Sequence, residues 1–227
     1  MQGFANAQGQ KILDDLVRSV GANKQYLSDL DGAIGDGDHG INLNKGFSLW
    51  AEELRKGSSD LSAGLASLSK ILLSSIGGAM GPLYGLIFSG LSAGCRGQDW
   101  IDGEVFGRMM AGAVTSVKTI SEAAIGDKTM MDVLLPAEEA YRDALQHGAS
   151  FSEALEALCR AAEAGRESTR DLVAKIGRAS RLGERSRGSL DAGAASCAVI
   201  LTSMAGSIRG LLAEPGEPAS PVSPPAR

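Results

Sequence analysis

The chain has 227 residues, of which 44% are apolar and 22% are charged, enough for one globular domain with a core of its own. The net charge of −5 and an aromatic content of 4% argue against nucleic-acid binding, which uses clustered basic side chains and stacking platforms. The three cysteines (Cys95, Cys159 and Cys197) are odd in number and far apart, which argues against a disulfide framework or a zinc site.

The sequence carries no recognisable export or membrane signal. Residues 1–10 are polar and lack the basic-then-apolar pattern of a signal peptide. No stretch reaches the roughly 18 uninterrupted apolar residues of a membrane span. We therefore expect a cytoplasmic protein with no membrane partner.

Helical periodicity dominates the first half of the chain. Apolar residues at helical spacing predict a first helix from about residue 12 that ends at a Gly- and Asp-rich stretch, residues 30–40. Further helices are predicted from about 42 to 55, from 61 to 76 and from 83 to 93.

Capping residues mark the later helices. Asp102 and Thr129 are suitable N-caps for a fifth and a sixth helix. Ser150 with Glu153 forms a capping-box pattern that begins a seventh, and Asp191 is suited to cap an eighth. No segment shows sustained strand alternation, so we predict an all-α fold of about eight helices.

The C-terminal end differs in composition from the rest of the chain. Residues 214–227 are rich in Pro, Ser and Glu, which predicts a disordered tail. The sequence thus predicts one domain over residues 1–213, followed by this tail.

The first of four polar breaks between helices places three carboxylates within eight positions. Asp31, Asp36 and Asp38 alternate with glycines and are followed by His39 and Asn42. Carboxylates this close repel one another unless a cation lies between them, and Mg²⁺ prefers oxygen ligands. A metal site is the sharper interpretation of this loop, and a solvated acidic turn is the plainer one.

The other three breaks are weaker signals when each is taken alone. Residues 74–82 combine small residues with a helix start, as phosphate cradles and tight helix–helix turns both do. In residues 126–132, Lys128 pairs with Asp127 or Asp132 if the segment is an ordinary surface cluster. Residues 177–193 hold four arginines among Gly and Ser, as expected of an anion site, a lid or a solvated loop.

Together these stretches resemble the nucleotide-binding L subunit, or DAK2-type domain, of dihydroxyacetone kinases. The matching segments are IGDGDHG (34–40), LLSSIGGAMGPLYG (72–85), GDKTMMDV (126–133) and GRASRLGERSRG (177–188). The resemblance implies an eight-helix antiparallel up-and-down barrel with ADP or ATP seated at one end.

The resemblance also implies roles for individual residues. Asp31, Asp36 and Asp38 match the family's ligands for two Mg²⁺ ions, and with Arg178 they form the predicted catalytic set. The predicted nucleotide-binding positions are His39, Gly40, Ile41, Asn42, Ala79, Met80, Met130, Arg178, Asp191, Ala192 and Gly193.

The family reaction implies partners. A phosphoryl group passes to a short ketose held on a separate K subunit, and a phosphotransferase-system M subunit recharges the bound ADP. The sequence leaves open whether the chain forms a homodimer, and whether free ATP or phosphoenolpyruvate supplies the phosphoryl group.

Two departures from the family pattern support an alternative. Met80 stands where the family often has Ser, and Ala192 stands where it has Pro. They are compatible with a nucleotide-binding regulatory module that transfers nothing, or with an ATP-dependent kinase subunit for another ketose.

Overall fold

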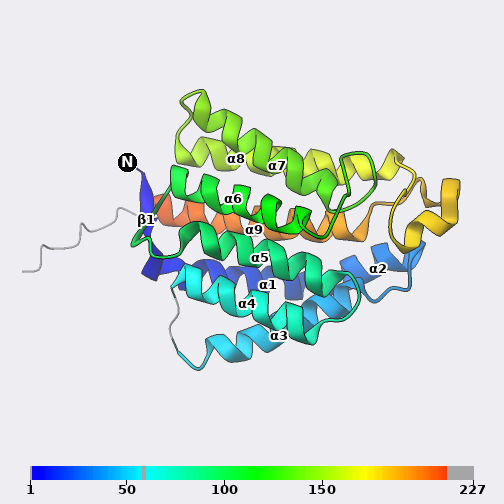
Figure 1. Cartoon of the computed structure of the whole chain (residues 1–227), viewed down its shortest axis with the longest axis horizontal. Coiled ribbons are helices and arrows are strands. Elements are labelled where there is room, and N and C mark those ends of the chain that lie inside the picture. The colour runs from blue at the N-terminus through cyan, green and yellow to red at the C-terminus, as the bar shows by residue number, and fades with distance from the viewer. Residues whose placement is uncertain (1, 58–59, 214–227) are drawn as a thin grey trace, which may run out of the picture.

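Helices that alternate in direction make up most of the computed structural model, which describes residues 2–57 and 60–213 (Figure 1). Apolar residues at helical spacing give each helix a buried face. The α-helices of the described residues are α1 (Gln10–Ala22), α2 (Lys24–Ile34), α3 (His39–Leu54), α4 (Leu61–Ser75), α5 (Met80–Cys95), α6 (Gly103–Lys118), α7 (Met131–Gln146), α8 (Phe151–Ser168) and α9 (Ala192–Ala213).

The helices close into a ring. From α3 to α9 each packs on the next, and α1 packs on both α9 and α3, which confirms the predicted all-α antiparallel barrel. The described residues contain nine α-helices because the first predicted helix is interrupted at Asn23. The side-chain amide of Asn23 donates to the Ser19 carbonyl oxygen (2.9 Å), so this residue ends α1 before α2 begins.

A short two-stranded sheet was not predicted. β1 (Gly3–Ala5) pairs antiparallel with β2 (Trp100–Asp102), and Phe4 lies opposite Ile101 in the register. Strands of three residues are too short to show the alternation by which strands are recognised.

Three of the four predicted helix caps are present in the structure. Asp102 accepts a hydrogen bond from the Val105 N–H (2.9 Å), and Ser150 with Glu153 forms the expected capping box. Asp191 accepts from the Ala194 N–H (2.7 Å) at the start of α9. The prediction for Thr129 is wrong by one position, because the N-cap residue of α7 is Met130.

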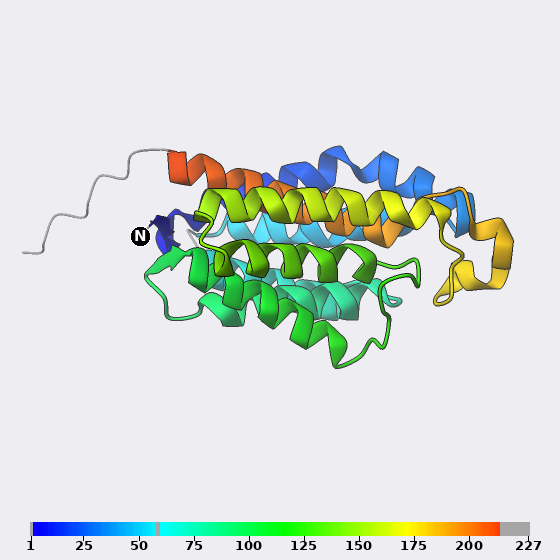
Figure 2. The same ribbon diagram turned by 90° about the horizontal axis from the view of Figure 1, so that it is seen from above.

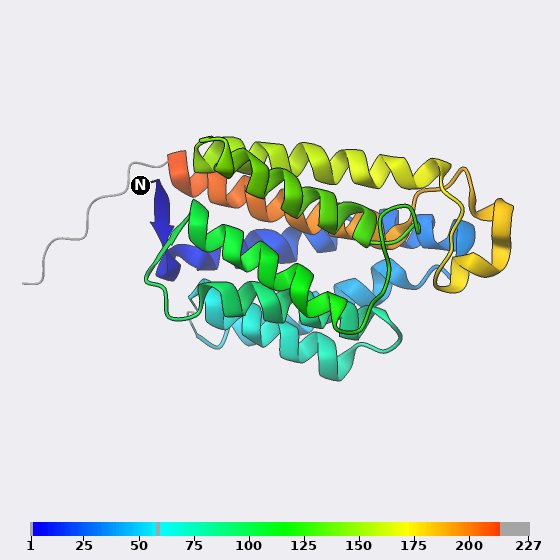
Figure 3. The same ribbon diagram turned by 45° about the horizontal axis from the view of Figure 1, so that its top comes forward.

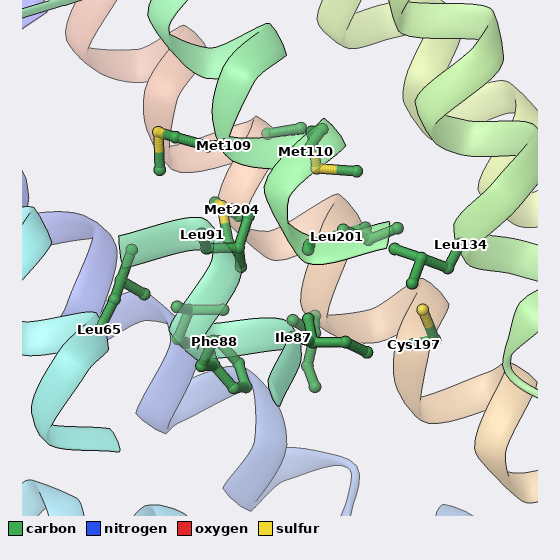
Figure 4. Packing of buried hydrophobic residues seen from close by; sticks show 14 of the residues in the cluster. Leu65, Ile87, Phe88, Leu91, Met109, Met110, Leu134, Cys197, Leu201 and Met204 are labelled. Carbon is green, nitrogen blue, oxygen red and sulfur yellow. The ribbon is translucent and has the colours of Figure 1, made fainter. Parts of the chain in front are cut away.

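Side chains from most helices meet inside the barrel. Figure 4 shows residues of α4, α5, α6, α7 and α9 pointing into one shared interior. Around it, Phe47 packs edge-on against Trp50 and Phe88, at ring-centroid distances of 5.7 and 5.9 Å.

Among the described helices, α9 alone is long and apolar enough to cross a membrane by length and composition. In the fold, 61% of its most apolar window is buried.

The alternation of helix direction determines where the polar breaks lie. Every second connection comes to the same end of the barrel, so the four polar breaks of the sequence meet there. The largest of them is the arginine arm (residues 172–190), which projects from that end in all three views (Figures 1, 2 and 3). It contains a 3₁₀ segment, Arg178–Ser186, that packs against α2. The predicted tail, residues 214–227, lies outside the described residues.

Candidate functional site

A cleft of about 530 Å³ opens between the loops at this end of the barrel. All the sequence-predicted site residues line it except Gly40 and Ile41. Gly40 is buried against α2, where a Cβ atom would overlap the Lys24 carbonyl oxygen. Ile41, on the outer side of α3, is 51% exposed. Gly40 is therefore a packing residue and Ile41 is a surface residue, and neither lines the cleft.

The acid triad (Asp31, Asp36 and Asp38) gathers at the cleft. One carboxylate oxygen from each residue lies within 4.8 Å of the others. Asp31 stands in the last turn of α2, not in a loop as predicted, and its Oδ2 accepts from the His39 N–H (3.2 Å). Gly37, with φ at +77°, allows the chain to reverse between the helices and bring the other two acids back towards Asp31.

A positive charge faces the acid triad from the other side of the cleft. Arg178, near the start of the arginine arm, forms an ion pair with Asp36. Both side chains are about half exposed, at 66% and 47%. Gly177, with φ at +75°, precedes Arg178 and turns the arm towards the cleft. The arm and the acid triad, about 140 positions apart in the sequence, therefore meet at one point.

Behind the triad lies a hydrogen-bond network that sequence reasoning missed. Ser196 Oγ lies 2.7 Å from His39 Nε2 and 2.6 Å from the Tyr84 hydroxyl, which also donates to the Gly193 carbonyl oxygen (3.2 Å). Burial lowers the pKa of His39 to about 4, although the Asp31 charge opposes this. His39 is therefore neutral near pH 7. Tyr84 and Ser196 lie within apolar helices, where no local pattern distinguishes them from core residues.

Asp191 forms the floor of the cleft at the N-terminus of α9. Its carboxylate accepts from the Ala194 N–H, and its own N–H donates to Thr169 Oγ1 (3.0 Å). Burial raises the pKa of Asp191 to about 6, while the Ala194 and Gly193 backbone N–H groups and the Lys128 charge act in the opposite direction. Ala192 and Gly193 follow it into the cleft wall.

The interpretation of Lys128 as part of a surface cluster is wrong. Lys128 is 2% exposed, and its Nζ donates to the carbonyl oxygens of Thr169 and Ser189. Asp127 pairs instead with Lys175 (3.1 Å), and Asp132 accepts from two loop N–H groups. The partners of Lys128 are distant in the sequence, so spacing could not reveal them.

The remaining wall comes from the loop before α5 and from the start of α7. Gly77, Gly78 and Ala79 are exposed, line the cleft and lead directly into the first turn of α5, whose backbone N–H groups have no partner within the helix. Met80 and Met130 add apolar surface. The site thus combines anion-binding groups, an acidic cluster and an apolar wall.

Comparison with known proteins identifies the family of this chain. The DAK2 domain family matches residues 33–206. The chain is 39% identical over 188 residues to the PEP-dependent dihydroxyacetone kinase 2, ADP-binding subunit DhaL, of Listeria innocua, covering 82% of this chain and 87% of that protein. It is 38% identical over 182 residues to the corresponding ADP-binding subunit of Escherichia coli K12, covering 80% and 87%.

The chain also matches about a third of the length of longer kinases. The L-erythrulose kinase of Pectobacterium atrosepticum is 32% identical over 183 residues, which are 79% of this chain and 31% of that protein. The solved dihydroxyacetone kinase of C. freundii, in complex with AMP-PNP and Mg²⁺, superposes with a TM-score of 0.66 at 24% identity. The match covers 91% of this chain and 35% of that one, and supports the fold. The chain matches these ADP-binding dihydroxyacetone kinase subunits over most of their length, and by its sequence it belongs to the DAK2 domain family.

Proposed function

We propose that this chain is the nucleotide-binding subunit of a dihydroxyacetone-type kinase. It binds ADP or ATP with Mg²⁺ in the cleft and passes a phosphoryl group to a hydroxyl of a short ketose, dihydroxyacetone or a similar sugar, bound on a separate K subunit. Its relatives of similar length are named as ADP-binding subunits of such kinases, and the more distant ones are kinases of related ketoses.

The observation that carries this proposal is the acid triad opposite an arginine. Three carboxylates with oxygens within 4.8 Å of one another form a hard oxygen donor set, which fits Mg²⁺. Asp31, Asp36 and Asp38 would hold the metal, and we assign two ions to them. A cation held by these carboxylates would supply the positive charge that offsets the negative charge developing during phosphoryl transfer.

The chain's other residues bind and orient the nucleotide. The Arg178 guanidinium offers a planar set of donors that suits phosphate oxygens at the mouth of the cleft. The N-terminus of α5, after Gly78 and Ala79, offers backbone N–H groups to a phosphate. Met80 and Met130 contact the nucleoside. His39 is neutral near pH 7, so it acts as a hydrogen-bonding group, and the base that activates the ketose hydroxyl comes from the K subunit.

The cleft end also suits a partner subunit. Four exposed isoleucines lie on the loops and helix ends there: Ile41, Ile120, Ile125 and Ile176, with 44–58% of each side chain exposed. We propose that the K subunit covers this end and excludes water during transfer. A phosphotransferase-system M subunit, in the cytoplasm, then restores ATP from the bound ADP, in line with relatives named as PEP- and PTS-dependent.

The nucleotide site is tested by calorimetric titration of Asp36→Asn with ADP in the presence of Mg²⁺. We expect Mg²⁺-dependent binding to be lost, because one ligand of the donor set is neutralised, while the melting temperature stays close to that of the wild type, because Asp36 is about half exposed. Asp29→Asn, an exposed position on the preceding helix α2, is the matched control. Unchanged affinity in Asp36→Asn would contradict the assignment.

A transfer assay separates the kinase subunit from the regulatory alternative. That alternative is favoured by Met80, which presents an apolar side chain rather than a hydroxyl to the cleft. The chain alone should phosphorylate no dihydroxyacetone, whereas addition of a cognate K subunit and ATP should yield sugar phosphate. Nucleotide binding without transfer in the complete mixture would favour the regulator.

Mass analysis of nucleotide released from the denatured protein distinguishes ADP that stays bound as a cofactor from ATP that exchanges freely as a substrate.

A further inference from the structure

The loop before α7 contains a buried lysine that the proposed reaction does not use. Lys128 is 2% exposed and has a left-handed backbone conformation, with φ at 62°. Among the residues that the structure describes, it is the only non-glycine residue with positive φ. This conformation is unfavourable for an L-residue and persists only where surrounding contacts fix it.

The contacts of Lys128 join the two ends of the arginine arm. Its Nζ donates to the carbonyl oxygen of Thr169, just after α8, and to that of Ser189, just before α9, each at 2.5 Å. The chain leaves the barrel after the first of these residues and returns at the second. One ammonium group from a third segment therefore binds both sides of the base of the arm.

Further hydrogen bonds surround this base. The Gly188 N–H donates to the Arg170 carbonyl oxygen (2.8 Å), and Arg187 Nη1 donates to the Asp171 carbonyl oxygen (2.7 Å). The neighbour of Lys128, Asp127, pairs with Lys175 on the arm. The arm is thus held at its base by residues 127 and 128.

The charges around the ammonium are mixed. The carboxylates of Asp191, Asp132 and Asp171 favour its charged form, while burial and the like charge of Arg170 oppose it. An apolar side chain at position 128 would leave two carbonyl oxygens without their donor. It would also leave Asp191 without its nearby positive charge.

We propose that Lys128 is a positioning residue that sets the arginine arm, and with it Arg178, opposite the acid triad. The inference rests on the proposed function, because it assigns Lys128 to the same nucleotide site. Arg178 is carried on the arm and touches the triad at Asp36. Its position there depends on how the base of the arm is held.

The test is a double-mutant cycle of Lys128→Met and Arg178→Ala, with the affinity for ADP and Mg²⁺ measured by calorimetry. If Lys128 acts through Arg178, each single variant weakens binding by about tenfold, and the double variant is no weaker than Arg178→Ala alone. Lys128→Arg should restore part of the loss, because it keeps the charge and hydrogen-bond donors. Lys118→Met, which removes an exposed lysine at the end of α6 that does not line the cleft, is the matched control.

Hydrogen exchange adds a structural measurement to the cycle. In Lys128→Met, the Gly188 and Asp191 amides should exchange faster, while those of α4 and α5 stay protected. Additive losses in the double variant, or wild-type affinity in Lys128→Met, would overturn the inference. If Lys128→Met does not melt cooperatively, the cycle is run with Lys128→Gln, which is polar but removes the charge, and the same outcomes decide. Absence of nucleotide binding in the wild type would instead refute the proposed function itself.

Discussion

Asp191 combines a helix cap with a strongly perturbed carboxyl group. Burial raises its pKa from 3.8 to about 6, although the Ala194 N–H and the Lys128 charge lower it. The folded protein therefore keeps the Asp191 proton to a higher pH than the unfolded chain does. The stability contributed by this group is greatest below about pH 4 and is lost as the pH rises to about 6, by up to about 3 kcal/mol.

Asp191→Asn should remove this dependence on pH while keeping an oxygen for the cap. We expect the free energy of unfolding of the variant, relative to the wild type, to increase between pH 4 and pH 7. Urea denaturation of nucleotide-free protein at several pH values measures the difference. A difference that stays constant with pH would show that the pKa of Asp191 is not raised in the folded state.

The pairing of α5 with α6 depends on glycines that let two backbones approach. A Cβ atom on Gly90 would overlap the Gly112 carbonyl oxygen, and one on Gly94 would overlap the Met109 backbone. The larger side chains of these helices point into the shared core instead. Close approach at this crossing therefore requires residues without a side chain.

Gly90→Ala should destabilise the fold by about 1–3 kcal/mol, because the helices must separate to admit the methyl group. Gly206→Ala on α9 is the matched control: nothing lies within 4 Å of a Cβ atom there, so alanine should stabilise the helix by up to about 1 kcal/mol. Both values come from urea denaturation. Equal effects of the two substitutions would show that the α5–α6 crossing is not tightly packed.

The binding of nucleotide should stabilise the barrel as a whole. The cleft draws residues from α2, α3, α5, α7, α9 and the arginine arm, so a ligand there contacts segments from both ends of the sequence. Binding to the folded state alone adds about 2.7 kcal/mol at a ligand concentration of 100 times Kd.

Differential scanning fluorimetry should therefore show a melting temperature that is higher by roughly 5–10 °C with ADP and Mg²⁺. ADP with EDTA should produce a much smaller rise, because the acid triad then repels the phosphates. Asp36→Asn should show the small rise under both conditions. A shift of equal size with and without the metal would show that the acid triad does not contribute to nucleotide binding through Mg²⁺.

Features that depend on neighbours in the chain could be predicted from the amino-acid order. Asp102 and Ser150 each cap a helix through an N–H three positions away, and the spacing of apolar residues along each helix is equally local. The acid triad spans eight positions, so its composition alone pointed to either a cation site or a solvated acidic turn. Resemblance to a family added the barrel and the nucleotide.

Features that depend on distant partners required the folded chain. Lys128 binds carbonyl oxygens 41 and 61 positions away, His39 meets Ser196 across 157 positions, and β1 finds its partner strand near residue 101. Closure of the helix ring brings these groups together, and no spacing rule describes it. Every residue also carries a backbone carbonyl group, so the sequence does not reveal which of them a side chain will bind. The chemistry of the site was therefore encoded in short motifs, whereas the support behind it arose from packing.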